Sequence, residues 1–343
     1  MLPFGTLQEA VRKLFSLFRA NGYYVCGKSC PPFFTLLTNN SSPEDQMVIL
    51  QSSFENALGL PEFVAYIFVF LFGAAVGSFL NVVIHRVPNE ESIVFPNSAC
   101  PKCATSIKPY DNIPILSWLL LRGKCRGCGE RISPRYPAVE LLTALLFLTV
   151  YSVIGFNAFL PVCLIFAAAI VALMFIDAGH MILPNVITYP LLVFALIVRI
   201  VFPLVFPEDY FGDLQAVPLH ILSGYPVWLV SLAAAILGAA AGGGSLWLVG
   251  ELWKRLRGVE AMGMGDVKMM LGVGALLGWR LTLLSIFIAA FAGSVIGIVI
   301  IARQKGKDMQ AMVPFGIFLG IGSIAALLFG DRLIAWYINS FIP

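Results

Sequence analysis

Two aspartates stand at the edges of strongly apolar runs, where an acid is costly unless it has a partner or a task. Asp177 ends one apolar run, and Asp266 opens another directly after the sequence Gly-Met-Gly. Two carboxylates held close together cannot both ionise easily, so they share a proton and titrate separately. One can then act as a base on a water molecule while the other donates a proton to a substrate carbonyl. Such a pair could hydrolyse a peptide bond without a covalent nucleophile.

The residues around these acids allow a catalytic and a purely structural explanation. Gly263 and Gly265 would let the backbone approach a substrate strand closely, and they could hold Asp266 in a non-helical turn. The structural alternative is that Asp266 caps a helix and that the other aspartate pairs with Lys268 or His180. Both explanations stay open on the residues alone.

Four cysteines form two Cys-x-x-Cys pairs. Cys100 and Cys103 make the first pair, Cys125 and Cys128 make the second, and residues 104–124 lie between them. This spacing is close to that of four-cysteine zinc sites, and four thiolates complete a tetrahedral site with no open position. We therefore expect a structural zinc that stabilises a lobe too small to build a good core alone. Two disulfides are the alternative, which a cytoplasmic location disfavours.

The composition indicates a membrane protein. Of the 343 residues, 59% are apolar and 12% are charged, against about 25% charged in an ordinary soluble domain. A soluble fold this apolar could not cover its surface with polar groups. The net charge of +3, with no basic stripe along any one segment, argues against a nucleic-acid partner.

Eight apolar segments could form membrane-spanning helices, each of which needs about 20 residues. They are expected at 63–84, 137–155, 158–176, 185–206, 226–249, 267–279, 281–302 and 313–330. The sixth is short and could begin within a re-entrant stretch. No alternating strand pattern appears, so helices must satisfy the backbone in lipid. The expected fold class is all-α, a polytopic membrane protein with about eight transmembrane helices and a small cytoplasmic zinc-binding lobe.

These segments divide the chain into four parts. Residues 1–62 are expected to be a loosely ordered N-terminal extension, and residues 63–84 the first transmembrane helix. Residues 85–136 form the zinc-binding lobe. Residues 137–343 form the transmembrane peptidase domain that carries both aspartates.

Basic residues indicate how the chain is oriented. The connections 85–136, 250–266 and 303–312 are rich in Lys and Arg, whereas 207–225 has neither. Eight alternating helices place the three basic connections on one side, which we expect to be the cytoplasm. Both aspartates then lie at the cytoplasmic ends of their helices, at similar depth.

Five motifs, in order along the chain, resemble those of the type IV prepilin peptidases, a family of membrane aspartic proteases of the Gly-x-Gly-Asp type. The motifs are Gly77–Ile84, the cysteine loop, Ile176–Asn185, Ala261–Trp279 and Val313–Leu319. The resemblance covers about residues 63–330. The chain departs from the family at Gly179, where a second acid is frequent, and at Asn185, where many members have Asp. The N-terminal extension is also longer than the family leads us to expect.

The resemblance implies a function that the residues alone do not reach. Such enzymes cut the basic leader from pilins and pilin-like subunits of type IV pili and type II secretion, at the cytoplasmic face of the inner membrane. Many also methylate the new N-terminal amine with S-adenosylmethionine. The implied partners are a pilin-like precursor, with a basic leader and an apolar N-terminal helix, and membrane lipid. Carried onto this chain, the catalytic pair is Asp177 and Asp266, and the lobe belongs to methyl transfer.

Further residues are candidates for substrate contact or methyl transfer. Glu140 opens the second apolar segment, where it could bind or deprotonate the substrate amine; an ion pair with Arg131 or Arg135 is the alternative. No glycine-rich nucleotide-binding loop is present, so S-adenosylmethionine is implied by resemblance alone. The remaining candidates flank the Gly-x-Gly-Asp aspartate: Gly263, Gly265 and Lys268.

Two other functions would use the same features. A proton- or cation-coupled transporter would employ the two intramembrane acids as relays, but many transporters show inverted repeats that are not visible here. A non-catalytic assembly protein would bind pilin helices without cutting them, yet it needs no pair of acids at matched depth. The sequence lacks the His-Glu-x-x-His and Gly-x-Ser-x-Gly motifs, which disfavours a zinc metalloprotease and a serine hydrolase.

Overall fold

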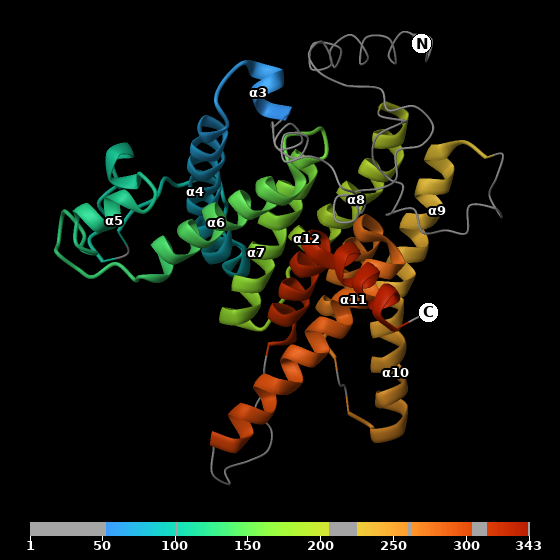
Figure 1. Cartoon of the computed structure of the whole chain (residues 1–343). Helices are drawn as coiled ribbons and strands as arrows, with labels where there is room; N and C mark the ends of the chain where they lie inside the picture. Colours follow the sequence, from blue (N-terminus) through green and yellow to red (C-terminus); the bar gives the residue numbers. More distant parts are fainter. Residues whose placement is uncertain (1–52, 101, 206–224, 260–261, 304–313, 342–343) are drawn as a thin grey trace, which may run out of the picture.

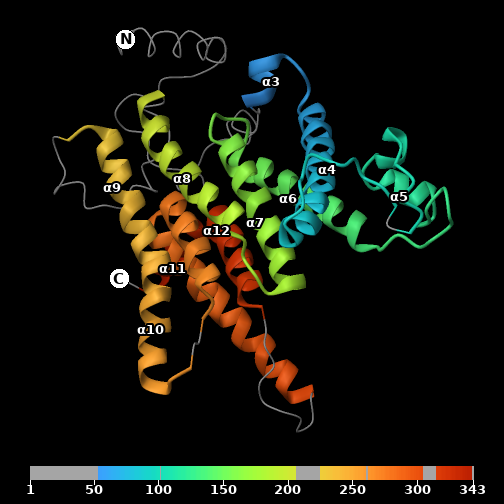
Figure 2. The ribbon, with the colours of Figure 1, turned by 180° about the vertical axis from the view of Figure 1, so that it is seen from behind.

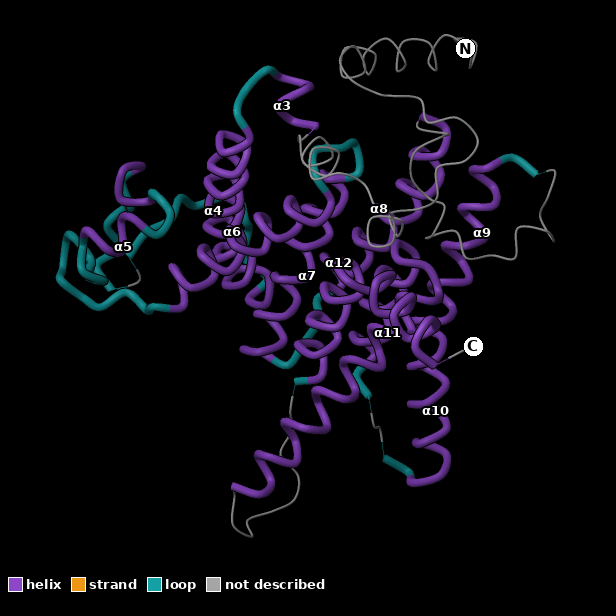
Figure 3. Tube along the Cα trace, viewed as in Figure 1, coloured by secondary structure: helices purple, strands orange, loops and turns teal. Residues whose placement is uncertain are grey.

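The computed structural model describes residues 53–100, 102–205, 225–259, 262–303 and 314–341 as a bundle of helices with a small lobe at one side (Figures 1 and 2). Within these ranges the chain contains helices, turns and loops but no strands (Figure 3). The all-α fold class is therefore confirmed.

Long helices make up the bundle. Their bounds are α4 Glu62–Arg86, α6 Arg135–Ile154, α7 Leu160–His180, α8 Asn185–Val205, α9 Val227–Ala239, α10 Ser245–Arg257, α11 Met264–Arg303 and α12 Phe315–Phe341. A π-helical turn, Ala240–Gly244, joins α9 to α10. Short elements are α3 Ser53–Leu58, α5 Leu116–Leu120 and the 3-10 turns Val87–Asn89 and Pro109–Asn112. In the described part, seven helices are long and apolar enough to cross a membrane, counting α9 and α10 as one.

The outer faces of these helices are apolar, as lipid-facing surfaces must be. Phe68, Phe287 and Phe291 are each more than 60% exposed. The inner faces bury residues of the same chemical kind, such as Ile170 and Leu319 at 0% exposure. Helices that are apolar all round fit a lipid solvent, and a patch of this extent would be an aggregation hazard in water.

Helix α11 is interrupted at Gly278, where φ is 77° and ψ is 169°. This backbone conformation is open essentially to glycine alone. Gly242 packs against both Met270 and Thr282, which a straight helix would separate by about 18 Å. The two halves of α11 therefore run side by side in opposite directions.

This reversal explains why length alone gives seven candidate spans where the sequence analysis counted eight. The predicted segments 267–279 and 281–302 meet beside the break at Gly278, and the two halves of α11 are counted together as one span. The first half covers residues 264–277 and is about 21 Å long at 1.5 Å per residue, short of the roughly 30 Å hydrocarbon core. The prediction that the sixth segment is short agrees with this.

The ends of several helices meet at one face of the bundle, which we call the lobe face. Helices α4 and α6 pack antiparallel, with Gly77 against Glu140, and the chain between them forms the lobe. The end of α7 contacts the start of α12 through Asp177 and Gly316. The start of α11 also lies there, because Gly265 packs against the α7–α8 connection.

The N-terminal extension, residues 1–62, lies mostly outside the described residues. Its described end contains α3 and the start of α4. Phe54 in α3 is 8% exposed and packs edge-on against Phe156 at a ring separation of 5.3 Å. This described end is helical, and its buried aromatic ring packs against the bundle. The rest of the predicted extension lies outside the described residues.

Candidate active site

Asp177 and Asp266 are placed at the lobe face by the ends of two helices. Asp177 lies in the last turn of α7 and is 6% exposed. Met181, at φ 54°, ends that helix, and its N–H donates to the Asp177 carbonyl at 2.9 Å. Asp266 lies in the first turn of α11, where its N–H donates to the Gly263 carbonyl at 3.1 Å. The two carboxylates are close enough to interact electrostatically.

The start of α12 forms a wall beside the Asp177 carboxylate. The backbone N–H groups of Gly316 and Ile317 face this carboxylate, and the N-terminal end of a helix stabilises negative charge. A Cβ atom at Gly316 would lie only 2.7 Å from Asp177 Oδ2. That oxygen is buried and has no hydrogen-bond partner among the described residues. A buried, unpartnered carboxylate oxygen is costly in a purely structural role.

Leu183 links the segments that carry the two acids. A Cβ atom at Gly265 would lie 2.9 Å from Leu183 Cβ, and one at Gly316 would lie 3.3 Å from Leu183 Cδ1. The starts of α11 and α12 therefore both close on the connection that follows Asp177. Glycine at these two positions permits the approach.

Lys268 does not neutralise either aspartate in the described structure. Its Nζ donates to Asn185 Oδ1 at 2.9 Å and lies 5.3 Å from the centre of the Tyr189 ring. Among the described residues no ion pair joins Lys268 to Asp177, so that structural alternative is not found. Lys268 instead ties the start of α11 to the start of α8, about half a turn from Asp266.

The four cysteine sulfurs gather in the lobe, all within 4.8 Å of one another. Cys100 and Cys128 are 3.8 Å apart, and Cys103 and Cys125 are 4.0 Å apart. A tetrahedral site with metal–sulfur bonds of about 2.3 Å requires sulfurs roughly 3.8 Å apart. The four cysteines are free thiols rather than disulfides, so this cluster could hold a metal ion.

Local hydrogen bonds shape each Cys-x-x-Cys turn. Ala104 N–H donates to the Cys100 carbonyl, and Gly129 N–H donates to the Cys125 carbonyl, both at 2.9 Å. Hydrogen bonds from Thr105 lower the pKa of Cys103 to about 6. A thiol that ionises readily is a better metal ligand than an ordinary one.

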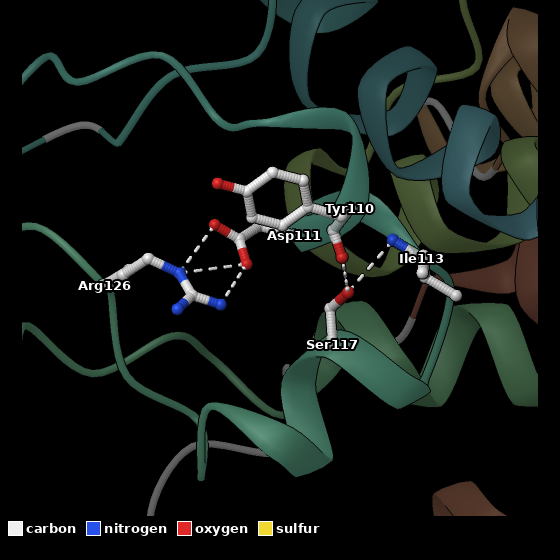
Figure 4. Close-up of polar contacts among 5 residues, drawn as sticks. All are labelled: Tyr110, Asp111, Ile113, Ser117 and Arg126. Atoms are coloured by element: carbon white, nitrogen blue, oxygen red, sulfur yellow. Dashed lines mark hydrogen bonds and ion pairs between the residues drawn. The ribbon is translucent and has the colours of Figure 1, made fainter.

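An ion pair and a hydroxyl bridge hold the rest of the lobe together (Figure 4). Arg126 donates to both oxygens of Asp111, the shortest contact being 2.6 Å. This guanidinium lowers the pKa of the Asp111 carboxyl below its ordinary value. Ser117 donates to the Tyr110 carbonyl at 3.1 Å and accepts from the Ile113 N–H at 3.0 Å. The cysteine cluster and α5 are thereby joined.

Glu140 connects the lobe to the bundle. Its Oε2 accepts from the Ile115 N–H at 2.7 Å, and Ser78 on α4 is a second hydrogen-bond partner. The expected ion pair with Arg131 or Arg135 is not found among the described residues. Arg135 instead donates to the Phe175 carbonyl at 2.9 Å, two residues before the α7 aspartate.

Sequence reasoning missed Arg199, which is 0% exposed inside the bundle. Its guanidinium donates to the carbonyls of Ala275 and Leu276 at 3.1 and 2.7 Å. These carbonyls end the short first half of α11, where helix geometry leaves acceptors unsatisfied. The signal was present in the sequence, since Arg199 is a charge within an apolar segment.

Comparison with known proteins identifies two matching families. The bacterial peptidase A24 N-terminal domain matches residues 71–154, and the type IV leader peptidase family matches residues 164–298. The first match covers α4, the lobe and α6, and the second covers α7 to α11 with both aspartates. No solved structure matches.

Curated relatives agree with these matches over nearly their whole length. A prepilin leader peptidase/N-methyltransferase from Aeromonas hydrophila is 36% identical over 84% of this chain and 98% of its own. Proteins with the same name are 35% identical in Pseudomonas aeruginosa, over 78% of this chain and 92% of theirs, and 33% identical in Legionella pneumophila, over 80% and 94%. The transporter and the non-catalytic assembly protein are left without support. The chain belongs to the type IV leader peptidase family, whose members are membrane aspartic proteases.

Proposed function

We propose that this chain cleaves the leader peptide of type IV pilin-like precursors with Asp177 and Asp266, and methylates the new N-terminus. The observation that supports the proposal is that two carboxylates, from the end of α7 and the start of α11, interact electrostatically near the start of α12. The relatives are named for both activities. The precursor would carry a basic leader and an apolar N-terminal helix that lies among the membrane helices.

The geometry assigns different tasks to the two acids. The N–H groups of Gly316 and Ile317 stabilise negative charge on Asp177, so Asp177 takes the proton from the attacking water. Asp266 donates its proton to the carbonyl oxygen of the scissile bond. As the resulting tetrahedral intermediate collapses, one of its two hydroxyls returns a proton to Asp266 and becomes the new carbonyl oxygen. The carbon–nitrogen bond breaks, and the leaving amine takes up the proton held by Asp177. No acyl-enzyme forms.

The substrate would reach the two acids from the lobe face, which we assign to the cytoplasm. The connections rich in Lys and Arg support this orientation because positive residues concentrate on the cytoplasmic side. The membrane would be the inner membrane. Gly263 lies next to Asp266 without a side chain, which would let a substrate strand approach the carboxylate, whereas the space at Gly265 is taken by Leu183. Lys268 positions this turn through Asn185.

We assign the lobe to methyl transfer, with zinc as a structural ion and S-adenosylmethionine as the methyl donor. Cys100, Cys103, Cys125 and Cys128 would hold the zinc, and the spacing of their sulfurs fits it. When bound, S-adenosylmethionine supplies the methyl group. Glu140 would bind or deprotonate the substrate amine, because its carboxylate lies where the lobe meets the bundle.

The test is direct. The purified protein is incubated in detergent with a pilin precursor and S-adenosylmethionine, and the products are weighed by mass spectrometry. We expect a shortened pilin whose mass is increased by one methyl group. A precursor that stays intact across several pilin-like substrates would overturn the peptidase assignment, and a shortened but unmethylated product would overturn only the methyltransferase.

A further inference from the structure

A hollow lies in the lobe, where the lobe joins the membrane-spanning helix α6. Its volume is 460 Å³, and its walls include Trp118 from α5 and three cationic side chains, Arg122, Lys124 and Arg131. Ser133 also lines it, two residues before α6 begins. Neither aspartate and none of the four cysteines lines this hollow.

The frame of the hollow is rigid. Trp118 donates its indole N–H to the Ile132 carbonyl at 3.1 Å, and the Ile132 N–H donates to the Gly123 carbonyl at 2.7 Å. Gly123, at φ 65°, packs so closely on the indole that a Cβ atom would lie 2.9 Å from it. These hydrogen bonds and this packing contact therefore hold the backbone next to Lys124 and next to Arg131 in place.

The cationic side chains that line this hollow have no acidic partner among the described residues. Lys124 and Arg131 are paired across an antiparallel bridge, and like charges directly opposite each other destabilise such a pair. Among the described residues, no acid forms an ion pair with either of them or with Arg122. Glu130, the nearest acid in sequence, lies 4.0 Å from Lys102 instead. An anion in the hollow would relieve this repulsion.

The surface beside the hollow is apolar. In α5, Leu116, Leu119 and Leu120 are 55%, 58% and 81% exposed. The lobe is tethered at both ends by membrane-spanning helices, α4 and α6 (Figures 1 and 2). A cationic hollow next to exposed leucines, at the start of a membrane span, matches the polar and apolar layers of a membrane surface.

We propose that this hollow binds the phosphate of an anionic phospholipid headgroup while the leucines of α5 enter the adjoining acyl layer. Lys124 and Arg131 contact the phosphate from the two sides of the antiparallel bridge, Arg122 contacts it from the turn just before Lys124, and Trp118 lies at the interface. The bound lipid holds the lobe against the membrane. Phosphate could also come from solution, so the headgroup and the free anion must be distinguished.

The experiment counts lipids that remain on the intact protein. The full-length protein is purified from a mixture of phosphatidylglycerol and phosphatidylcholine, and native mass spectrometry measures the retained lipids. The test variant carries Lys124→Gln and Arg131→Gln. The control carries Lys102→Gln and Lys108→Gln, which removes the same charge from the same lobe outside the hollow. Parallel samples contain inorganic phosphate or S-adenosylmethionine as competitors.

We expect the wild type and the control to retain phosphatidylglycerol in preference to phosphatidylcholine. The test variant should bind phosphatidylglycerol about 30-fold more weakly, because each charge near an anionic membrane contributes about 1 kcal/mol. It should be no less thermally stable in lipid-free detergent, since it removes a repulsive pair. Benzoylphenylalanine in place of Leu120 should crosslink to lipid acyl chains in nanodiscs.

Equal retention of phosphatidylglycerol by the test variant and the control would overturn the proposal. So would an absence of lipid crosslinks at position 120. Displacement of the lipid by millimolar phosphate would assign the hollow to a soluble anion and would overturn the proposal. Displacement by S-adenosylmethionine, whose net charge is positive, would assign the hollow to the methyl donor and would overturn it as well. None of these outcomes depends on peptidase activity.

Discussion

Two helices, α7 and α12, form the environment of the Asp177 carboxylate. It lies at the end of α7, yet the residue that approaches it most closely is Gly316, from the start of α12. No side chain separates that helix end from the carboxylate. The site therefore depends on a glycine about 140 positions away along the chain. Because Gly316 has no side chain, the N–H groups at the start of α12 can approach the Asp177 carboxylate.

Substitution of Gly316 by alanine tests this contact. The new methyl group would lie 2.7 Å from Asp177 Oδ2, so either the carboxylate or α12 must shift. Because a displacement of about 1 Å can cost 100-fold in rate, we expect the cleavage rate to fall roughly 10- to 100-fold while the protein remains folded. The matched control is Gly297→Ala in α11, where a Cβ atom meets nothing within 4 Å. A Gly316→Ala enzyme as active as this control would contradict the close approach.

The ion pair of Asp111 with Arg126 should respond to pH. Arg126 holds the pKa of Asp111 below its ordinary value of about 3.9. Because the folded state favours the carboxylate form, the pair contributes to the stability of the folded state above about pH 4. This contribution is lost as the pH falls through the lowered pKa. NMR titration of selectively labelled aspartate should give a depressed pKa for Asp111. The Arg126→Gln variant should return it toward 3.9, and an unchanged pKa in this variant would contradict the pairing.

At the scale of elements, the break in α11 decides where Asp266 can lie. The half that carries Asp266 is too short to cross the membrane and ends against the buried guanidinium of Arg199. Gly238 and Gly274 contact each other's backbone carbonyls, so α9 packs directly on this half. The short half is thus held at its far end and along its side, which fixes the depth of its first turn.

Replacing Gly278 with alanine should weaken this arrangement. The backbone there occupies a region that costs residues other than glycine about 1–3 kcal/mol. We expect the free energy of unfolding to fall by about that amount, measured by reversible unfolding in mixed detergent. Gly297→Ala again serves as the control, because it lies in the second half of the same helix with open space around it. Equal stability of the two variants would show that the reversal does not require glycine.

The sequence was sufficient to predict the helices but not their close contacts. Apolar runs located α4, α6, α7 and α8 to within a few residues, because lipid imposes length and composition on any spanning helix. Helix α12 begins near the predicted start but runs on to Phe341, beyond the predicted end at residue 330. The separate segments 267–279 and 281–302 already implied a reversal here, but its position at Gly278 could not be identified, since an isolated glycine in an apolar run is also compatible with a straight helix. Likewise, the spacing of the cysteines indicated their cluster, whereas the approach of Gly316 to Asp177 depends on tertiary packing.

At the scale of the whole molecule, the lobe and the bundle are joined by few polar contacts. Glu140 accepts a hydrogen bond from Ile115 in the lobe, and Arg135 donates to Phe175 in α7. In the described part of the chain, the contacts found for the two aspartates come from the ends of α7, α11 and α12, and none of them comes from the lobe. The cysteine cluster and the aspartates should therefore be separable by mutation.

The variant Cys103→Ser should show this separation. Loss of one thiolate should release the metal and loosen the lobe, because a site of four ligands stabilises the folded form on binding. We expect faster proteolysis between residues 90 and 130 and impaired methylation, with cleavage within about threefold of wild type at equal protein levels. Cys163→Ser, in the core of α7 away from the cluster, is the control for losing a thiol. A cleavage defect in Cys103→Ser alone would mean that the lobe supports the peptidase.

In the mechanism that we propose, Asp177 and Asp266 cleave the precursor together. The most direct measurement is the cleavage of a purified pilin precursor by Asp177→Asn and Asp266→Asn enzymes, followed by mass spectrometry, with Glu251→Gln as the control. Glu251 pairs with Arg255 on the exposed side of α10, so its loss removes an acid without touching the site. We predict that each aspartate variant loses cleavage by at least about 1000-fold, since neither acid can act alone, while the control is unaffected. Substantial cleavage by either aspartate variant would contradict the paired mechanism.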